Sequence, residues 1–319
     1  MRIALTLLFA SIGFTSLAHA QLPSFYRQVA GMVWVVKDTR PVVEGWTKLG
    51  LTDVAAQPAR PFARWTRARL ARMNIDFFEP LAPRGDLFGG FLKRRADGVF
   101  ALVYRVPSED VLQAEIARLR TAGVAVMMDV KLPRAGRNAR YVFFDTEREG
   151  KYAIALVHDP AAEQEPASAA RRISQYAFVV RDAAPVSAYW KKLGFPELSI
   201  TRPALTELYF RGKPASFEQE LGWQRHGVVP FEWCVPPRGA ATVYAEFLKE
   251  HGEGLQHIAF NVADMDKAIA EHKALGFEAV QGGGWGEEGK PGSGRFAYVD
   301  TDRIGGILIE LLWNYRAPQ

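Results

Sequence analysis

The fold is decided by a short pattern, AFVVRD at residues 177–182, in which an apolar run ends at Asp182 and Leu193-Gly194 follows eleven positions later. An apolar run of this length is typical of a buried strand. An aspartate at its end is a favoured helix N-cap, because its side-chain oxygen accepts a hydrogen bond from an otherwise unpaired backbone N–H. A glycine is favoured where a helix ends in a left-handed conformation. The pattern therefore predicts a strand followed by a helix that ends near Leu193.

The same pattern occurs three more times along the chain. The copies are VWVVKD at residues 33–38 with Leu49-Gly50, FNVAD at residues 260–264 with Leu275-Gly276, and a looser ALVYRV at residues 101–106 with Ser108 and Ala122-Gly123. Short β-like runs follow each predicted helix, so each copy predicts a strand–helix–strand–strand–strand (βαβββ) module. Four such modules in 319 residues predict an α+β fold.

The modules group into two halves, because FDT at residues 144–146 recurs as VDT at residues 299–301. Between the halves lies a stretch rich in Ala, Glu, Pro and Ser, which is typical of a linker. We expect one paired-module domain over residues 21–158, a linker over residues 159–172, and a second domain over residues 173–319.

The first twenty residues have the pattern of an export signal. Arg2 gives a basic start, residues 3–14 are apolar, and Ala18-His19-Ala20 is a small-residue cleavage pattern. We expect a signal peptide at residues 1–20 that is cut after Ala20, and a periplasmic or secreted mature protein. No later apolar segment is long enough to span a bilayer, so no membrane attachment is expected after cleavage.

The composition excludes several classes of protein. The chain is 48% hydrophobic and 24% charged, which is ordinary for a globular protein, and its net charge of +5 comes from scattered basic residues. Such scatter argues against a nucleic-acid partner and is compatible with a small-molecule substrate. The single cysteine, Cys234, excludes an internal disulfide and any CxxC metal or redox site.

Polar side chains inside apolar strands are the candidate functional residues, because burying a polar group without a partner costs free energy. Glu310 lies within ILIELLW at residues 307–313, and Glu232 lies within VPFEWC at residues 229–234. His257 stands between Leu255 and Ile258, and Gln175 directly precedes the apolar run of the third module.

The second half resembles the vicinal oxygen chelate superfamily, which includes glyoxalase I, extradiol dioxygenases and bleomycin-resistance proteins. The resemblance is carried by HGEGLQHIAF at residues 251–260, DMDKA at residues 264–268, FAYVDT at residues 296–301 and IELL at residues 309–312. It implies that the four βαβββ modules pair into two glyoxalase-like domains with curved mixed sheets, which close around a divalent metal ion.

The resemblance also implies a set of metal ligands, at one position in the first and last strand of each module. In the second half these positions hold Gln175, Glu232, His257 and Glu310, the ligand types of the glyoxalase I branch. Such a set suits Zn, Ni, Co, Mn or Fe, and affinity order alone does not choose among them. The corresponding first-half residues are expected to be Gly31, Phe78, Ala101 and Ala155, which cannot bind a metal.

The glycine-rich stretch at residues 282–294 predicts a loop over the mouth of the cavity, with Trp285 as a substrate contact. Trp223 is a second candidate for substrate contact. The stretch formally matches GxGxxG, but a strand and not a helix is expected after it, so no nucleotide cofactor is predicted.

These observations favour an exported metalloenzyme, a lyase or isomerase that acts on a small substrate with neighbouring oxygens. The resemblance implies metal-stabilised enediolate chemistry, with Glu310 as the first candidate base and Glu232 as the second. Two alternatives are an extradiol-type ring-cleaving dioxygenase, whose usual ligands include a histidine where this chain has Gln175, and a non-catalytic binding protein of the bleomycin-resistance kind. The sequence leaves open the substrate, the metal, and whether one chain or a homodimer completes the site.

Overall fold

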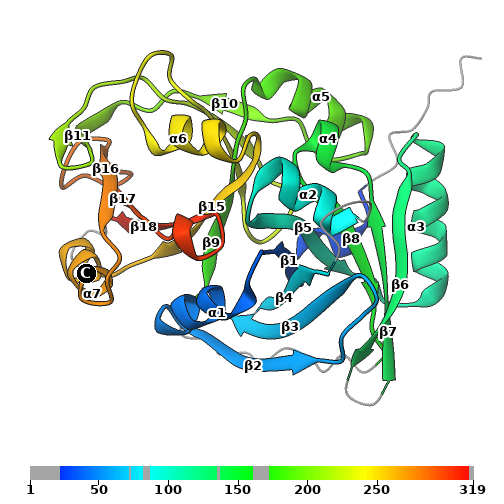
Figure 1. Cartoon of the computed structure of the whole chain (residues 1–319). Helices are drawn as coiled ribbons and strands as arrows, with labels where there is room; N and C mark the ends of the chain where they lie inside the picture. Colours follow the sequence, from blue (N-terminus) through cyan, green and yellow to red (C-terminus); the bar gives the residue numbers. More distant parts are fainter. Residues whose placement is uncertain (1–21, 72, 82–86, 135–136, 161–171, 316–319) are drawn as a thin grey trace, which may run out of the picture.

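The computed structural model describes residues 22–315, except residue 72 and residues 82–86, 135–136 and 161–171. The predicted signal peptide and most of the predicted linker lie outside the described residues. Figure 1 shows the two halves of the chain side by side, the first coloured blue to green and the second green to red. No helix among the described residues is long and apolar enough to cross a membrane.

Two mixed sheets form the molecule. The first has the order β2-β3-β4-β1-β5-β8-β7-β6, and its central strands combine parallel and antiparallel pairs. Its strands are β1 (Gly31–Val35), β2 (Leu51–Gln57), β3 (Ala63–Leu70), β4 (Met73–Pro80), β5 (Gly98–Arg105), β6 (Val126–Arg134), β7 (Arg137–Phe144) and β8 (Ala153–His158). The predicted α+β class with curved mixed sheets is confirmed.

The second sheet has ten strands in the order β10-β13-β14-β9-β15-β18-β17-β16-β11-β12. They are β9 (Ile173–Val179), β10 (Ser199–Thr201), β11 (Leu205–Phe210), β12 (Lys213–Pro214), β13 (Glu220–Gln224), β14 (Phe231–Val235), β15 (Gly254–Asn261), β16 (Ala279–Trp285), β17 (Gly294–Val299) and β18 (Leu308–Asn314).

The module helices begin and end where the repeated pattern predicts. They are α1 (Thr39–Lys48), α3 (Glu109–Thr121), α5 (Ala183–Lys192) and α7 (Met265–Ala274). Asp38, Ser108, Asp182 and Asp264 cap them, each accepting from a backbone N–H of the first turn. Gly50, Gly123, Gly194 and Gly276 follow with φ between 86° and 101°, the conformation that favours glycine.

The halves pack against each other through a shared apolar core and two equivalent tryptophan contacts. Trp46 of α1 donates to the carbonyl of Ile304 in the short 3₁₀ helix η2 (Asp302–Ile304), at 2.8 Å. Trp190 of α5 donates in the opposite direction, to the carbonyl of Gly150 in α4 (Glu147–Gly150), at 3.2 Å. One continuous cluster of buried side chains includes residues from both halves. The halves are therefore one packed body.

His251 strengthens the contact between the halves. Its Nδ1 lies 2.9 Å from the carbonyl oxygen of Arg95 in the first half, so Nδ1 carries a proton and donates. Its Nε2 lies 2.9 Å from a carboxylate oxygen of Asp302. Burial alone would lower the pKa of His251, but Asp302 outweighs burial and raises it. The contact between the halves is the Nδ1–H bond to Arg95, and the carboxylate of Asp302 favours the charged form of the ring that makes it.

The concave side of the first sheet is filled by side chains. The helix α2 (Leu87–Arg95), which the repeats do not predict, places Phe88 and Phe91 there. Phe88 stacks on Phe78 with ring centroids 4.7 Å apart and meets the edge of Phe100 at 5.6 Å. This aromatic packing occupies the space that the second half leaves for a cavity.

Asp76 is a buried carboxylate of the first half, at a position that sequence comparison assigns wrongly. Asp76 pairs with Val33 of β1, and Glu232 pairs with the equivalent Ala177 of β9. The counterpart of Glu232 is therefore Asp76, and not Phe78 as the sequence predicts. Gly31, Ala101 and Ala155 do hold the other three positions.

Asp76 is neutralised by the chain itself. Arg67 donates to both carboxylate oxygens, through Nε at 2.7 Å and Nη2 at 3.2 Å. Trp65 Nε1 donates to Oδ1 at 3.1 Å, and the Tyr141 hydroxyl donates to Oδ2 at 3.2 Å. This arginine supplies, within the first half, the positive charge that a buried carboxylate requires.

The second sheet is closed by a strap. Residues 199–201 (β10) pair with β13 at one end of the sheet, and residues 205–210 (β11) pair with β16 at the other end. Residues 202–204 therefore connect the two edges of the second sheet. In the first sheet no such segment of the described chain joins the edge strands β2 and β6. Figure 1 shows this chain running across the top of the second half from β10 to β11.

The predicted loop at residues 282–294 is only partly a loop. Gly282, Gly283 and Gly284 belong to β16, and the turn is confined to residues 286–293. The glycines serve close packing of β11 on β16. A Cβ atom at Gly282 would lie 2.8 Å from a ring carbon of Tyr209, closer than side-chain contacts allow.

Candidate metal centre and its cavity

A β-bulge in β15 sets up the site. Leu255 pairs with Phe178 and His257 with the next residue, Ala177, so Gln256 is an extra residue in the strand. The bulge brings consecutive side chains together, which a regular strand would place on opposite faces. His257 Nδ1 lies 2.6 Å from Gln256 Oε1, and Gln256 Nε2 donates to the carbonyl of Val243 at 3.3 Å.

This contact fixes the tautomer of His257. The Gln256 oxygen can only accept, so the proton of the neutral imidazole lies on Nδ1 and the lone pair on Nε2. Nε2 is buried and makes no hydrogen bond to the protein. It is therefore available as a ligand atom.

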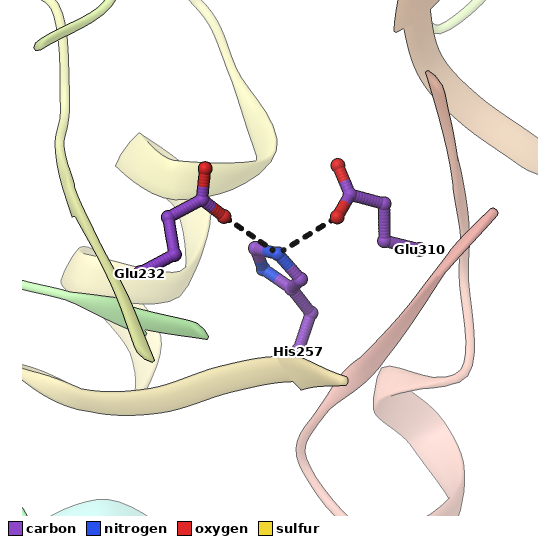
Figure 2. A group of neighbouring side chains, drawn as sticks. All are labelled: Glu232, His257 and Glu310. Atoms are coloured by element: carbon purple, nitrogen blue, oxygen red, sulfur yellow. Dashed lines mark ion pairs between the residues drawn. The ribbon is translucent and has the colours of Figure 1, made fainter. Parts of the chain in front are cut away.

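Two carboxylates converge on that nitrogen. Glu232 Oε2 from β14 and Glu310 Oε2 from β18 each lie 3.4 Å from His257 Nε2. Figure 2 shows both carboxylates directed at the same ring nitrogen from opposite sides. His257 is fully buried and each glutamate is 4% exposed. One ligand atom from each residue lies within 4.8 Å of the others.

Gln175 from β9 completes the group. Ala259 of β15 pairs with both Gln175 and Glu310, which brings the two side chains to the same level of the sheet. The Gln175 amide donates through Nε2 to Glu232 Oε2 at 2.8 Å and to Glu310 Oε2 at 3.0 Å. The amide thus presents nitrogen to the centre, and a half-turn would present its oxygen instead.

The electrostatics of this group favour a positive charge at its centre. Burial and the neighbouring Glu310 raise the pKa of Glu232, against the effect of His257. Burial lowers the pKa of His257, but Glu310 and Glu232 together raise it to about 9. Positive charge beside Nε2 is therefore strongly favoured, whether it comes from a proton or from a metal ion.

The residues fit a divalent metal ion. One imidazole lone pair, two buried carboxylates and an adaptable amide form a hard, oxygen-rich donor set, which suits Zn, Ni, Co, Mn or Fe. A hydrogen-bonded residue behind the ligating histidine, here Gln256, is a regular feature of metal sites.

A cavity of about 380 Å³ opens above the group. Its wall includes both tryptophans that the sequence predicts as substrate contacts, Trp223 and Trp285. The Trp223 indole N–H donates to Thr201 of the strap at 3.0 Å, and the Arg225 guanidinium lies 5.2 Å from the Trp223 ring. The volume is at the small end of the range for small-molecule sites, about 300–1,000 Å³.

Two further residues near these strands, His226 and Cys234, are not among the candidate ligands. His226 packs between Phe195 and Phe231 and borders a separate pocket between the halves. Cys234 is fully buried beside Glu232, and burial raises its pKa well above the usual thiol value. It is therefore an inert thiol.

Sequence reasoning misses Gln256, Arg225 and two cavity tyrosines, Tyr244 and Tyr298. Gln256 could have been found, because aligning His257 with Ala101 of the first half places Gln256 opposite the apolar Phe100. A polar residue at that position in one half only is a signal of function.

The comparisons with known proteins concern the sequence of the second half and the fold of both halves. Residues 174–298 match the sequence profile of the Glyoxalase/Bleomycin resistance protein/Dioxygenase superfamily. No curated protein matches the chain in sequence.

Three solved structures resemble the whole molecule. A triple variant of 4-hydroxymandelate synthase from Streptomyces coelicolor has a TM-score of 0.60 and 16% identity, covering 92% of this chain and 94% of that one. A xylose isomerase-like TIM barrel/4-hydroxyphenylpyruvate dioxygenase fusion protein has a TM-score of 0.56 and 13% identity. The match covers 92% of this chain and 49% of that one. The Mn(II)-bound glyoxalase from Novosphingobium aromaticivorans has a TM-score of 0.51 and 14% identity. The match covers 91% of this chain and 83% of that one.

At these identities the likeness concerns the fold, and it extends over both halves. The second half thus matches the sequence profile of this superfamily over residues 174–298, and the four-module fold is shared with the three solved structures over nearly the whole chain.

Proposed function

We propose that the second half is a divalent-metal-dependent lyase or isomerase of the glyoxalase I type, and that the first half is its structural companion. The observation that carries the proposal is the convergence of Glu232, His257 and Glu310 beside a cavity that the two glutamates line. The similar glyoxalase that binds Mn(II) supports it. The substrate would be small and carry neighbouring oxygens.

A divalent ion held by these residues would supply Lewis acidity toward a carbonyl oxygen of the substrate. The chain supplies the proton transfer. Glu310 would accept the proton from the carbon next to that carbonyl and return it to the adjacent carbon, which completes an isomerisation. His257, held by Gln256, keeps its lone pair directed at the centre throughout.

The contacts of the two carboxylates support Glu310 as the base. Glu232 interacts with Gln175 and His257, and also with the thiol of Cys234. Glu310 interacts with Gln175 and His257 through Oε2. With one contact fewer, the Glu310 carboxylate is the freer of the two to turn toward a substrate.

The test is metal analysis of the mature protein, together with exchange of solvent deuterium into a small α-hydroxyketone followed by NMR. Wild-type protein should contain a divalent metal and catalyse the exchange. Glu310→Gln should fold, keep some metal and lose the exchange, while Glu232→Gln should keep part of it. Wild-type exchange in Glu310→Gln would contradict the assignment of the base.

An oxygen-dependent ring cleavage is the second candidate. The profile match to a superfamily that includes dioxygenases supports it. The ligand set speaks against it, since one histidine and two carboxylates differ from the 2-His-1-carboxylate triad. Oxygen uptake with Fe²⁺ and a catechol would establish this candidate in place of the first. A protein that takes up no metal on titration would instead favour a non-catalytic binding role.

We also propose that the protein is exported after cleavage behind Ala20, on the pattern of its first twenty residues. Mass spectrometry of the protein from the periplasmic fraction of its host would then give a chain that begins at Gln21. A full-length chain in the cytoplasm would contradict this.

A further inference from the structure

Two tyrosine hydroxyls line the cavity and have no part in the proton transfer described above. Tyr244 comes from the helix α6 (Val243–Glu250) and Tyr298 from β17, and their hydroxyl oxygens lie 2.7 Å apart. They are 4% and 2% exposed. Both border the same cavity as Glu232 and Glu310.

The pair has one proton more than it uses. Each hydroxyl carries one proton, and the hydrogen bond between the two oxygens needs only one of them. Among the described residues, neither tyrosine has a second acceptor. The other proton is therefore free to be donated to whatever fills the cavity, and a buried donor without an acceptor is unfavourable.

Both hydroxyls remain donors at physiological pH. Burial raises the pKa of each phenol well above its usual value, and the neighbouring carboxylates Glu232 and Glu310 raise it further. The pair cannot serve as a base. It is a neutral donor in a low-dielectric cavity, the kind of group that stabilises an oxygen on which negative charge develops.

The first half offers an internal comparison. Tyr298 pairs with Glu310 across β17 and β18, and the equivalent pair in the first half is Phe143 with Ala155. Where the ligands are absent, the hydroxyl is also absent. The same fold position thus accepts phenylalanine, and the hydroxyl occurs only beside the candidate centre.

The other side chains of the cavity wall indicate what kind of ligand body would fit. It is largely aliphatic and aromatic, with Leu205, Leu221, Trp223, Trp285, Phe296 and Leu312. Such walls take an aromatic ring or a branched aliphatic group.

We propose that the Tyr244–Tyr298 hydroxyl pair donates a hydrogen bond to the carbonyl oxygen of a small ligand with an aromatic or branched aliphatic body. The inference rests on the proposed function only in taking that ligand to be the substrate. The donor itself requires no metal.

The test uses acetophenone as a probe, bound to protein stripped of metal by a chelator. The carbonyl stretching band of the bound probe reports directly on hydrogen bonding, which packing alone does not change. The variants are Tyr244→Phe, Tyr298→Phe and the double variant, with Tyr104→Phe, a buried tyrosine of the first half, as the control.

In wild type and in the control, the band should lie at lower frequency than in the double variant. The double variant should bind the probe about 2- to 12-fold more weakly, the contribution of one neutral hydrogen bond. The tyrosine that donates to the ligand should account for nearly all of this loss as a single variant. The other single variant should have a smaller effect, an asymmetry that a packing role would not produce.

A carbonyl band at the same frequency in the double variant and in wild type would overturn the inference. The absence of saturable binding of the probe to wild type would also overturn it. The metal content of the wild-type preparation tests the proposed function separately. If the protein binds no metal but shows the band shift, the hydrogen-bond donor is supported and the metalloenzyme proposal is contradicted. If it binds metal but shows no shift, the metalloenzyme proposal is supported and the donor is contradicted.

Discussion

Gln256→Leu is the substitution that tests most directly how the candidate centre is built. Gln256 is fully buried, and its side chain makes a 2.6 Å hydrogen bond with His257 Nδ1 and a 3.3 Å bond to the Val243 carbonyl of α6. Leucine is similar in volume and fills the bulge, but it cannot accept a hydrogen bond. The imidazole then loses the partner that keeps its lone pair on Nε2.

The expected loss of metal affinity is about 10- to 100-fold, the usual effect of removing the hydrogen-bond partner of a ligating histidine. This corresponds to about 1.4–2.7 kcal/mol of binding free energy. The effect should belong to the upper part of this range, because His257 is fully buried and its bond to Gln256 is short, at 2.6 Å. The fold should survive, since the wall of the bulge is apolar in the first half, where Phe100 holds the same position.

The assay is competition for Zn²⁺ or Co²⁺ with a chelator of known affinity. Gln256→Glu retains an acceptor and should bind metal at least as well as wild type. Phe100→Leu changes the equivalent bulge in the first half and should leave metal affinity unchanged. Affinity in Gln256→Leu equal to that of wild type would refute the reasoning, because Nδ1 would then need no partner to present Nε2.

Two further predictions concern stability. Arg67→Met leaves the buried carboxylate of Asp76 without its cation, so the free energy of unfolding in urea should fall by about 3–5 kcal/mol. Adding Asp76→Asn should recover much of this loss. An unchanged unfolding midpoint in Arg67→Met would contradict the pairing. His251→Gln removes a group whose pKa in the folded protein is raised above 6.5 by Asp302, so its contribution is full below pH 6.5 and is lost as the pH rises through the folded value. The difference in unfolding free energy between wild type and this variant should therefore shrink as the pH rises above 6.5, and a constant difference would show that Asp302 does not favour the charged form of the ring.

The sequence was sufficient for the architecture because the deciding signals are local. A strand that ends at Asp182 and a helix that ends before Gly194 depend on capping chemistry within a few residues. The same signals at Asp38 and Asp264 made the repeats visible. The helices α2 and α6 have no such counterpart in the repeated pattern, so the repeats do not predict them.

The residues around the candidate centre were harder to predict, because their placement depends on register. The extra residue in β15 makes Gln256 and His257 neighbours in space, against the alternation of a regular strand. The counterpart of Glu232 was misplaced by two residues, at Phe78, because only strand pairing identifies Asp76. The cavity walls depend on contacts between distant segments, such as Leu205 with Trp285, which no local pattern contains.

The strap between β10 and β11 has a consequence for the traffic of molecules. Because residues 202–204 tie the two edges of the second sheet together, those edges cannot separate without breaking the pairing of β10 with β13 or of β11 with β16. We therefore expect the cavity of about 380 Å³ to keep its size when a ligand binds. A ligand would then be selected by its size as well as by its oxygens.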